Sequence, residues 1–169
     1  EEQVFPVLTP LAVDPGHPFP FISNQSLNLG ILLKNEDRKK ELFARVKVDL
    51  EPRFVPLPLD HKDHLKNAVW IGVPLEQIIA HNLSALFPGM VILECHPFRV
   101  TRNADLSVEE DEAEDLLLAL EQELRKQRKG GSVVRLEVLK SMSVRMRDRL
   151  LQELEVEPQD VYSLAGILN

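Results

Sequence analysis

The sequence predicts an α+β domain in which about three helices pack on a mixed, mainly antiparallel sheet. Two observations carry this prediction. Short segments near the start and in the second half alternate apolar and polar residues, as half-buried strands do. Longer segments repeat apolar residues every three or four positions, as the buried face of a helix does. The length of 169 residues, 44% of them hydrophobic, fits one packed domain or two small ones.

The first two strands are predicted at residues 27–34 and 42–50, joined as a hairpin by the charged segment NEDRKKE. The second segment has the period of two that places alternate side chains on opposite faces of a sheet. Its inward-facing residues are Ala44, Val46, Val48 and Leu50.

Residues 52–67 are expected to be irregular, apart from a short edge-like piece at Phe54 and Val55, and residues 69–73 to form a short strand. A helix follows Pro74, a residue that the first helical turn tolerates. Its apolar stripe consists of Leu75, Ile78, Ile79, Leu83 and Leu86, and it ends at Pro88 and Gly89. Residues 90–102 then form one strand broken near Pro97, or two short strands.

The strongest helix signal covers residues 108–129, after a plausible N-cap at Ser107. Acidic residues come early in this segment and basic residues late, which suits the helix dipole, and Gly130 and Gly131 end it. A strand at 133–139, a helix at 143–155 and a short strand at 161–164 complete the chain. The stripe of the last helix is Met146, Leu150, Leu151 and Leu154.

Residues 5–24, FPVLTPLAVDPGHPFPFISN, combine five of the chain's twelve prolines with many large apolar side chains. Proline excludes a helix or a central strand, whereas disordered linkers are poor in large apolar groups. We therefore expect an ordered and partly buried strip. Its expected anchors are Phe5, Phe19, Phe21 and Ile22.

Composition narrows the function classes. The net charge of −7 argues against broad binding to nucleic acid or to anionic membranes. Cys95 is the only cysteine, so a disulfide framework and a multi-cysteine metal site are excluded, and a reducing, cytoplasmic setting is the simplest interpretation. The chain has no signal peptide and no apolar run of about 20 residues that could span a membrane. It begins at Glu1 without an initiator methionine, as a piece of a longer protein would.

Most motifs that could carry chemistry have a structural explanation. There is no GxxxxGK[ST] phosphate loop, and the turn at Gly130-Gly131-Ser132 suits a helix C-cap better than a phosphate site. His61 and His64 in DHKDH could bind a metal, but a solvated loop is favoured because no distant third ligand is apparent.

Three further groups of residues also have a structural explanation. Cys95 and His96 are adjacent on a strand and so point to opposite faces, where they cannot share a proton. His81 falls on the polar side of its helix. The acidic run at 109–115 could bind a metal or a basic partner, but a solvated helix face matched to the dipole is favoured.

The segment FRVTRN, residues 98–103, is the one candidate binding site. Arg99 and Thr101 should share one face of a strand, with Arg102 and Asn103 at its exit. Two arginines, a threonine and an asparagine at a strand end can bind an anion. The alternative is that both arginines pair with Asp105 or with the acids at 109–115 and only stabilise the fold.

These motifs, in their order, resemble a known family. The proline-rich segment, then SLNL, FARVKV, VPLEQIIAHNLSALFPGM, FRVTRNADLSVEEDEAEDLL and VRLEV, is similar to the middle region of polyphosphate kinase. This is the bacterial, histidine-phosphorylating family that makes inorganic polyphosphate from ATP. The similarity runs from Phe5 to about Asn169 and is weaker in the loops at 33–41 and 58–68.

The resemblance implies two parts: residues 1–24 as a proline-rich packed connector from a missing N-terminal helical domain, and residues 25–169 as the middle, or head, domain. In the family, the terminal phosphate of ATP passes through a phosphohistidine to the growing chain, with magnesium. The histidine and nucleotide motifs belong chiefly to the C-terminal domains. None of His17, His61, His64, His81 and His96 sits in such a motif, so no catalytic, cofactor-binding or metal residue is expected here and the isolated chain should be inactive.

The resemblance also implies a supporting role, in dimerisation and in shaping the active-site tunnel. The implied partners are the other domains of the polypeptide, a second copy of the enzyme and nearby inorganic polyphosphate, with ATP and magnesium bound by the parent enzyme; no nucleic acid is expected. The parent enzyme would be cytoplasmic, with peripheral membrane association left open. The alternative hypothesis is a free-standing α+β module that binds anions or another protein.

Overall fold

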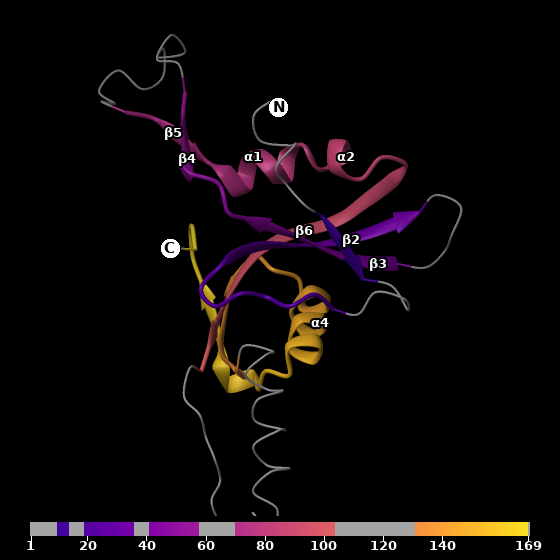
Figure 1. The fold of residues 1–169 in the computed structure, drawn as a ribbon, viewed down its shortest axis with the longest axis vertical. Coiled ribbons are helices and arrows are strands. Elements are labelled where there is room, and N and C mark those ends of the chain that lie inside the picture. The colour runs from indigo at the N-terminus through magenta and orange to yellow at the C-terminus, as the bar shows by residue number, and fades with distance from the viewer. Residues whose placement is uncertain (1–9, 14–18, 36–40, 58–69, 104–130, 169) are drawn as a thin grey trace, which may run out of the picture. The chain divides into compact units, whose positions relative to one another are not determined.

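The computed structural model describes residues 10–13, 19–35, 41–57, 70–103 and 131–168 (Figure 1). The chain divides into two compact units. Unit 1 comprises Glu1–His17 and Asn28–Pro97, and unit 2 comprises Pro18–Leu27 and Phe98–Asn169. Strand β6 (Met90–Arg102) contributes residues to both units.

The larger sheet has six strands in the order β1-β3-β2-β6-β7-β8. β1 pairs antiparallel with β3, β6 antiparallel with β7, and β7 parallel with β8. Besides β6, the strands are β1 (Leu11–Val13), β2 (Leu27–Asn35), β3 (Glu41–Val48), β7 (Val133–Leu139) and β8 (Val161–Leu164). The prediction of a mixed sheet in an α+β domain is therefore confirmed. β1 lies within the proline-rich segment, at the edge of the sheet where proline-rich sequence is tolerated.

The core of unit 1 forms between one face of β2 and β3 and two short helices, α1 (Leu75–His81) and α2 (Leu83–Leu86). It contains Leu29, Ile31, Leu33, Ala44, Val46, Leu75, Ile79, Leu83 and Phe87. The sequence predicted one continuous helix here, but Asn82 separates two. Its side-chain Nδ2 donates to the carbonyl of Ile78 at 2.8 Å, and its φ of −112° lies outside the helical range.

A second, two-stranded sheet in unit 1 consists of β4 (Phe54–Pro56) and β5 (Gly72–Pro74), paired antiparallel. Phe54 meets Trp70 edge to face, with ring centroids 6.4 Å apart. Gly72 lies beneath the indole, where a Cβ would lie 2.2 Å from a Trp70 ring carbon, so a larger residue would displace this ring. At the base of the sheet, Arg53 Nη2 donates to Glu76 Oε1 of α1 at 2.7 Å.

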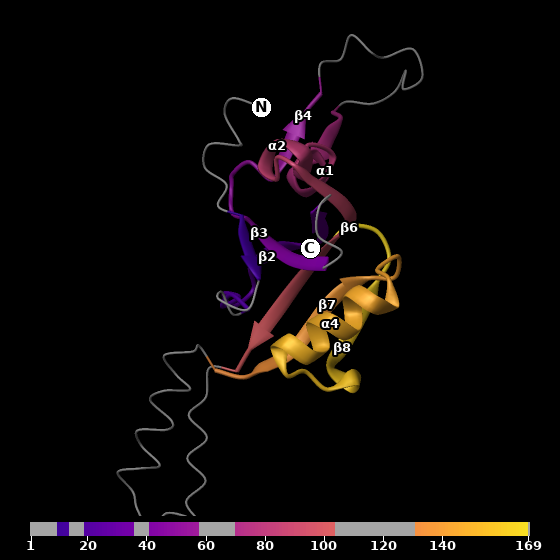
Figure 2. The ribbon, with the colours of Figure 1, turned by 90° about the vertical axis from the view of Figure 1, so that its right-hand side faces the viewer.

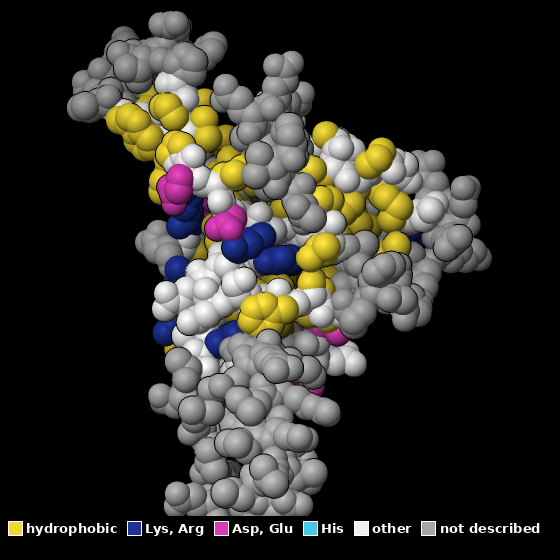
Figure 3. Space-filling model, in the orientation of Figure 1, with side chains coloured by type: hydrophobic (Ala, Val, Ile, Leu, Met, Phe, Trp, Pro, Cys, Tyr) yellow, Lys and Arg dark blue, Asp and Glu magenta, His cyan; other side chains and the backbone are white. Residues whose placement is uncertain are grey.

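Hydrophobic side chains gather on the surface over β4 and β5 (Figure 3). We call Phe54, Leu57 and Trp70 the apolar patch; their exposed fractions are 36%, 44% and 58%. Neighbouring exposed residues of this size and type are unusual on the surface of a protein without a partner. The patch is therefore a candidate contact surface.

The core of unit 2 lies between one face of β6 and β7 and the helix α4 (Val144–Leu154), which lies against β7 (Figure 2). Phe98, Val100, Leu136, Val138, Met146 and Leu150 are at most 1% exposed. A 3-10 turn, η4 (Pro158–Asp160), leads into β8. The expected break of the strand at Pro97 does not occur: β6 is continuous, and its pairing with β7 begins one residue later, at Phe98.

The residues expected to anchor the proline-rich strip differ in burial. The strip from 19 to 24 is anchored by Ile22, which is fully buried, and by the half-buried Phe19. The predicted burial of Phe21 is wrong, because this side chain is 52% exposed. Phe5, Ser107 and the helix predicted at 108–129 lie outside the described residues.

Helix α4 carries caps at both ends. Ser143 Oγ accepts a hydrogen bond from the backbone N–H of Met146 at 3.1 Å, as an N-cap does. Glu155 ends the helix in the left-handed conformation, with φ of 54°. These caps fix the limits of the helix, which agree with the predicted range 143–155 when the two cap residues are included.

The N-cap makes a testable contribution to stability. We expect Ser143→Ala to lower the free energy of unfolding by about 0.5–2 kcal/mol, because the N–H of Met146 loses its acceptor. Chemical denaturation of this chain would measure the change. Ser141→Ala, in the exposed turn before the helix, is the matched control and should have little effect; equal effects of the two substitutions would contradict the cap.

Candidate anion-facing site

The pairing of β6 with β7 places the predicted FRVTRN residues. Arg99 lies opposite Glu137, and Thr101 lies opposite Arg135. Directly opposed residues of an antiparallel pair project to the same face, so these four side chains share the face that is turned away from α4. The parallel pairing of β7 with β8 adds Tyr162, in register with Glu137. We call these five residues the arginine face.

Glu137 holds the two arginines of this face together. Arg99 Nε donates to Glu137 Oε2 at 2.6 Å, and Arg135 Nη2 donates to Oε1 at 2.8 Å. The Arg99 hydrogen bond is the main cause that lowers the pKa of Glu137; burial opposes it, and Arg135 lowers the pKa further. The Glu137 side chain is 6% exposed, whereas those of Arg99 and Arg135 are 25% and 42% exposed.

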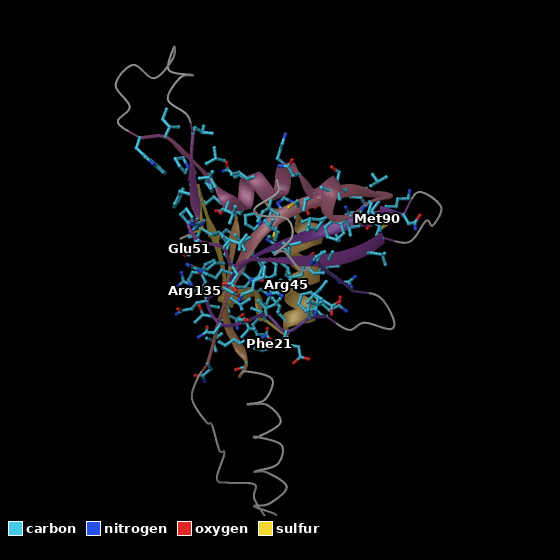
Figure 4. The ribbon with its side chains drawn as sticks, turned by 45° about the horizontal axis from the view of Figure 1, so that its top comes forward. Phe21, Arg45, Glu51, Met90 and Arg135 are labelled. Carbon is cyan, nitrogen blue, oxygen red and sulfur yellow. The ribbon has the colours of Figure 1, made fainter. Side chains whose placement is uncertain are left out.

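Arg135 also stacks on an aromatic ring, with its guanidinium carbon 4.1 Å from the ring centroid of Tyr162 (Figure 4 labels Arg135). Within the described part of the chain, Arg99 and Arg135 each make one side-chain hydrogen bond, both to Glu137. Each guanidinium carries five N–H donors, so donors remain on both. The arginine face carries two positive charges against one negative charge, and can accept an anion at its exposed side.

Arg102 has a different environment from the one expected of an anion-facing residue. The register of β6 with β7 shifts between Thr101 and Arg102. Arg102 Nε donates to the carbonyl of Ile22 at 2.7 Å, and Nη1 to that of Gly131 at 2.6 Å. Its guanidinium lies over the ring of Phe21, 4.5 Å from the centroid. Burial lowers the pKa of Arg102.

Arg102 therefore fastens the strip 19–24 to the end of β6. Its backbone N–H donates to Asn24 Oδ1 at 2.9 Å, which adds a third link to the same strip. Phe21 is exposed on one side because its other side is covered by a cation instead of by hydrocarbon. Apolar and aromatic residues in a proline-rich segment are thus explained by a docked strip. Ile22 and Phe19 anchor it by burial, and the exposed Phe21 adds a contact with the Arg102 guanidinium.

Asn103 and the glycine turn meet at the same end of β6. The backbone N–H of Asn103 donates to the carbonyl of Ser132 at 2.9 Å. Gly131 has φ of +71°, and a Cβ on it would lie 2.1 Å from the carbonyl oxygen of Asn103. The glycine is thus required by its backbone conformation and by this close approach, while the helix that it was expected to cap lies outside the described residues.

The sequence missed Arg135, Glu137 and Tyr162 as members of the face. Their signal was present in the alternation of VVRLEVL, which places Arg135 and Glu137 on one side of a strand. Only the pairing of β7 with β6 and β8 shows that this side is shared with Arg99. Asp105 and the acids at 109–115, the alternative partners predicted for the arginines, lie outside the described residues. Within the described ranges, Arg99 pairs with Glu137.

The other candidate groups carry little chemistry. Burial raises the pKa of the Cys95 thiol to about 12, which suppresses the reactive thiolate. His96 Nε2 lies 3.4 Å from Glu94 Oε2. His81 is exposed at the end of α1, as predicted, while His61 and His64 lie outside the described residues. Among the residues that the structure describes, no cluster of histidine, cysteine or acidic side chains could hold a metal ion.

In the described ranges, every helix is too short or too polar to cross a membrane.

Comparison with known proteins decides the family. The model of the polyphosphate kinase middle domain matches residues 1–169. The chain belongs to this family. A polyphosphate kinase of Synechocystis sp. is 61% identical over 171 residues, covering 99% of the chain and 24% of that protein. One of Mycolicibacterium gilvum is 54% identical over 169 residues, covering 99% of the chain and 23% of that protein.

The fold of the polyphosphate kinase middle domain also has a structural counterpart. The crystal structure of polyphosphate kinase from Porphyromonas gingivalis matches with a TM-score of 0.69 at 22% identity, over 99% of the chain and 22% of that protein. At this identity the likeness concerns the fold alone. The chain spans about a quarter of the length of these three proteins.

The charge of Glu137 gives the middle domain a predicted dependence on pH. Because the pKa of Glu137 is lower in the folded state than its ordinary value of 4.5, the carboxylate stabilises the fold above about pH 4.5. This contribution is lost as the pH falls through the lowered folded-state pKa. We expect Glu137→Gln to cost about 1–3 kcal/mol at pH 7 and progressively less below pH 4.5.

Denaturation of wild type and variant between pH 7 and pH 2.5 would measure this difference. The exposed Glu157→Gln is the control and should show no such convergence. A constant difference between wild type and Glu137→Gln at all pH values would contradict the role of the charged carboxylate.

Proposed function

We propose that this chain is a non-catalytic domain of an enzyme that transfers the terminal phosphate of ATP to inorganic polyphosphate through a phosphohistidine, with magnesium. The observation that carries the proposal is the match of the whole chain to the middle domain of polyphosphate kinase, together with its coverage of only about a quarter of the relatives' length. In the described residues, neither His81 nor His96 lies in a metal-ligand cluster. The chemistry then belongs to the remaining three quarters of the parent enzyme.

The role of the domain in the parent enzyme is to support self-association and to shape the tunnel that holds the active site. The apolar patch of Phe54, Leu57 and Trp70 supports the first part, because exposed aromatic side chains are enriched at protein interfaces. Its partners are other domains of the same polypeptide or a second copy. A cytoplasmic location accords with the single, half-buried cysteine.

The arginine face is proposed to contact the polyphosphate chain beside the tunnel. Arg99 and Arg135 supply the unfilled N–H donors, and Thr101, which lies opposite Arg135, supplies a hydroxyl. Arg102 and Asn103 hold the end of β6 in place. A protein of net charge −7 repels a polyanion overall, so contact requires a local excess of positive charge. Two exposed guanidinium groups beside one shielded carboxylate provide that excess.

The non-catalytic role predicts the result of phosphate labelling. With γ-labelled ATP and magnesium, we expect no base-stable label on the 169-residue chain, because its histidines lie outside any catalytic motif. The full-length polyphosphate kinase that carries this sequence should become labelled under the same conditions and serves as the positive control. Label on His17, His61, His64, His81 or His96 would contradict the proposal.

The anion-facing role is tested by Arg135→Gln in the full-length enzyme. Arg135 is the more exposed arginine of the face, and Glu137 keeps Arg99 as its partner when Arg135 is replaced. One exposed ion contact contributes about 0.2–1 kcal/mol, so we expect chain elongation to weaken by roughly 1.4–5-fold at low salt and less at high salt.

Arg147→Gln is the matched control. Arg147 lies on α4, its side chain is 43% exposed against 42% for Arg135, and both substitutions change the net charge equally. The control should elongate polyphosphate as wild type does. If Arg135→Gln also elongates normally at every salt concentration, the arginine face does not bind the chain.

A further inference from the structure

Glu137 of β7 is a carboxylate at the centre of a face that is proposed to bind an anion. It lies directly opposite Arg99, and its side chain is 6% exposed. The hydrogen bond from Arg99 is the main cause that lowers its pKa, so the carboxylate is charged at neutral pH. A charged carboxylate repels a polyanion, so by its charge alone Glu137 weakens the site that it occupies. Its contacts with the two arginines offset this repulsion.

The two carboxylate oxygens of Glu137 are divided between two arginines. Arg99 Nε donates to Oε2 at 2.6 Å, and Arg135 Nη2 donates to Oε1 at 2.8 Å. Arginine side chains have many rotamers, and fixing them when a ligand binds costs free energy. Because one nearly buried carboxylate holds both guanidinium groups, much of their freedom is already lost when the domain folds, before an anion arrives.

Tyr162 of β8 restrains Arg135 from a second direction. Tyr162 is in register with Glu137 on the neighbouring strand, and its ring centroid lies 4.1 Å from the Arg135 guanidinium carbon. The ring covers one face of the planar guanidinium, while Glu137 accepts a hydrogen bond at its edge. Within the described part of the chain, neither arginine of the face has a buried side-chain nitrogen without a partner, so the N–H donors left over are open to solvent.

The ion pair of Arg53 and Glu76 in unit 1 shows a different arrangement at the same burial. The side chains of Arg53 and Glu76 are 26% and 6% exposed. The corresponding fractions for Arg99 and Glu137 are 25% and 6%. Arg53 occupies both oxygens of Glu76, with Nη2 to Oε1 at 2.7 Å and Nε to Oε2 at 3.4 Å. That pair is neutral, whereas Glu137 binds two arginines through one oxygen each and leaves a net positive charge with spare donors.

We infer that Glu137 and Tyr162 are positioning residues of the arginine face, which hold Arg99 and Arg135 in place to receive the phosphoryl oxygens of polyphosphate. The inference deepens the proposed function and rests on it, because it concerns how the same face binds the same ligand. A guanidinium that is already oriented loses less freedom on binding, which improves affinity by about twofold to tenfold for each side chain. With two arginines held, this gain exceeds the repulsion from one carboxylate whose oxygens are both covered by cations.

The sign of one substitution separates positioning from charge. In the full-length enzyme, Glu137→Gln removes a negative charge, yet we expect KM for polyphosphate in chain elongation to rise about threefold to tenfold. The amide has one carbonyl oxygen, so it accepts from one arginine while its NH₂ group, a donor, faces the other. We expect kcat to stay within about twofold of wild type, because a loss of binding that is equal in the ground and transition states raises KM alone. An unchanged or a lowered KM overturns the inference.

Glu76→Gln is the matched control for loss of stability. It removes an equally buried carboxylate from an arginine of nearly equal exposure, at a position outside the arginine face. Both variants should unfold at a lower temperature than wild type, so their kinetics are compared at a temperature at which both are folded. Glu76→Gln should leave KM for polyphosphate as in wild type. An equal rise in the two variants would reject positioning, because loss of stability alone would then raise KM.

Tyr162→Leu tests positioning without changing any charge, and it decides the inference if Glu137→Gln does not fold. Tyr162 is 45% exposed, so its replacement leaves the core of unit 2 intact. We expect KM for polyphosphate to rise about twofold to fivefold, because Arg135 loses the ring on which its guanidinium stacks. In an Arg135→Gln enzyme the same substitution should cause no further rise, since Tyr162 acts through Arg135. A wild-type KM in Tyr162→Leu, or additive effects in the double variant, would contradict the inference.

Failure of the inference and failure of the proposed function give different results. If Arg135→Gln alone leaves KM unchanged at every salt concentration, the arginine face does not bind polyphosphate and the inference falls with it. If Arg135→Gln raises KM but Glu137→Gln and Tyr162→Leu do not, the face binds the chain without positioning by these two residues. Labelling of the 169-residue chain tests the non-catalytic role independently of both.

Discussion

The register between β6 and β7 is the constraint on which unit 2 depends. Phe98 opposite Val138 and Val100 opposite Leu136 direct apolar side chains toward α4, and the intervening pairs direct Arg99, Thr101, Arg135 and Glu137 to the other face. A shift by one residue would exchange the two faces and bury arginines beneath the helix. The apolar core thus fixes the register, and the register then fixes the geometry of the arginine face. Stability and the candidate binding surface have one origin.

Arginine side chains organise both units, each through a different kind of partner. Arg99 and Arg135 share the carboxylate of Glu137, which allows two cations to lie close together on the polar face of a sheet. Arg102 uses backbone carbonyls and the ring of Phe21, so a proline-rich strip with few backbone donors is held by a side chain. Arg45 relies on the neutral Asn28 within the described residues. The first arrangement leaves N–H donors for a ligand, the second leaves few, and the third gives Arg45 a neutral hydrogen-bond partner.

The small sheet of β4 and β5 has an exposed apolar surface and an ion pair at its base. The apolar patch over β4 and β5 presents Phe54, Leu57 and Trp70 on the surface, where removal from water would favour association. Glu76 and Arg53 fix the base of that sheet to α1 by an ion pair in which the acid is almost completely buried. A rigid base with an exposed apolar end suits a contact surface in a larger assembly, since little order has to be gained when it binds.

Local sequence determined much of this domain. Alternation predicted β3 and β7, the stripe of Met146, Leu150 and Leu154 predicted α4, and long matching segments pointed to polyphosphate kinase from the sequence alone. These features depend on periodicity and on residue order, which are properties of one segment at a time. The sequence did not predict the break at Asn82, which depends on a hydrogen bond from the Asn82 side chain. It also did not predict that β6 continues through Pro97, because this depends on where the pairing of β6 with β7 begins.

Tertiary structure alone decided which distant side chains meet. Arg99 and Glu137 are 38 positions apart and Arg102 and Ile22 are 80 apart, so the sequence showed the arginines but not their partners. Arg45 looked like an outward-facing strand residue, because its neighbours Ala44 and Val46 face the core. Its face is buried as well, and burial depends on what packs on a strand from elsewhere in the chain. Pairing and burial are long-range properties, which is why the charge balance of these arginines could be read only from the folded molecule.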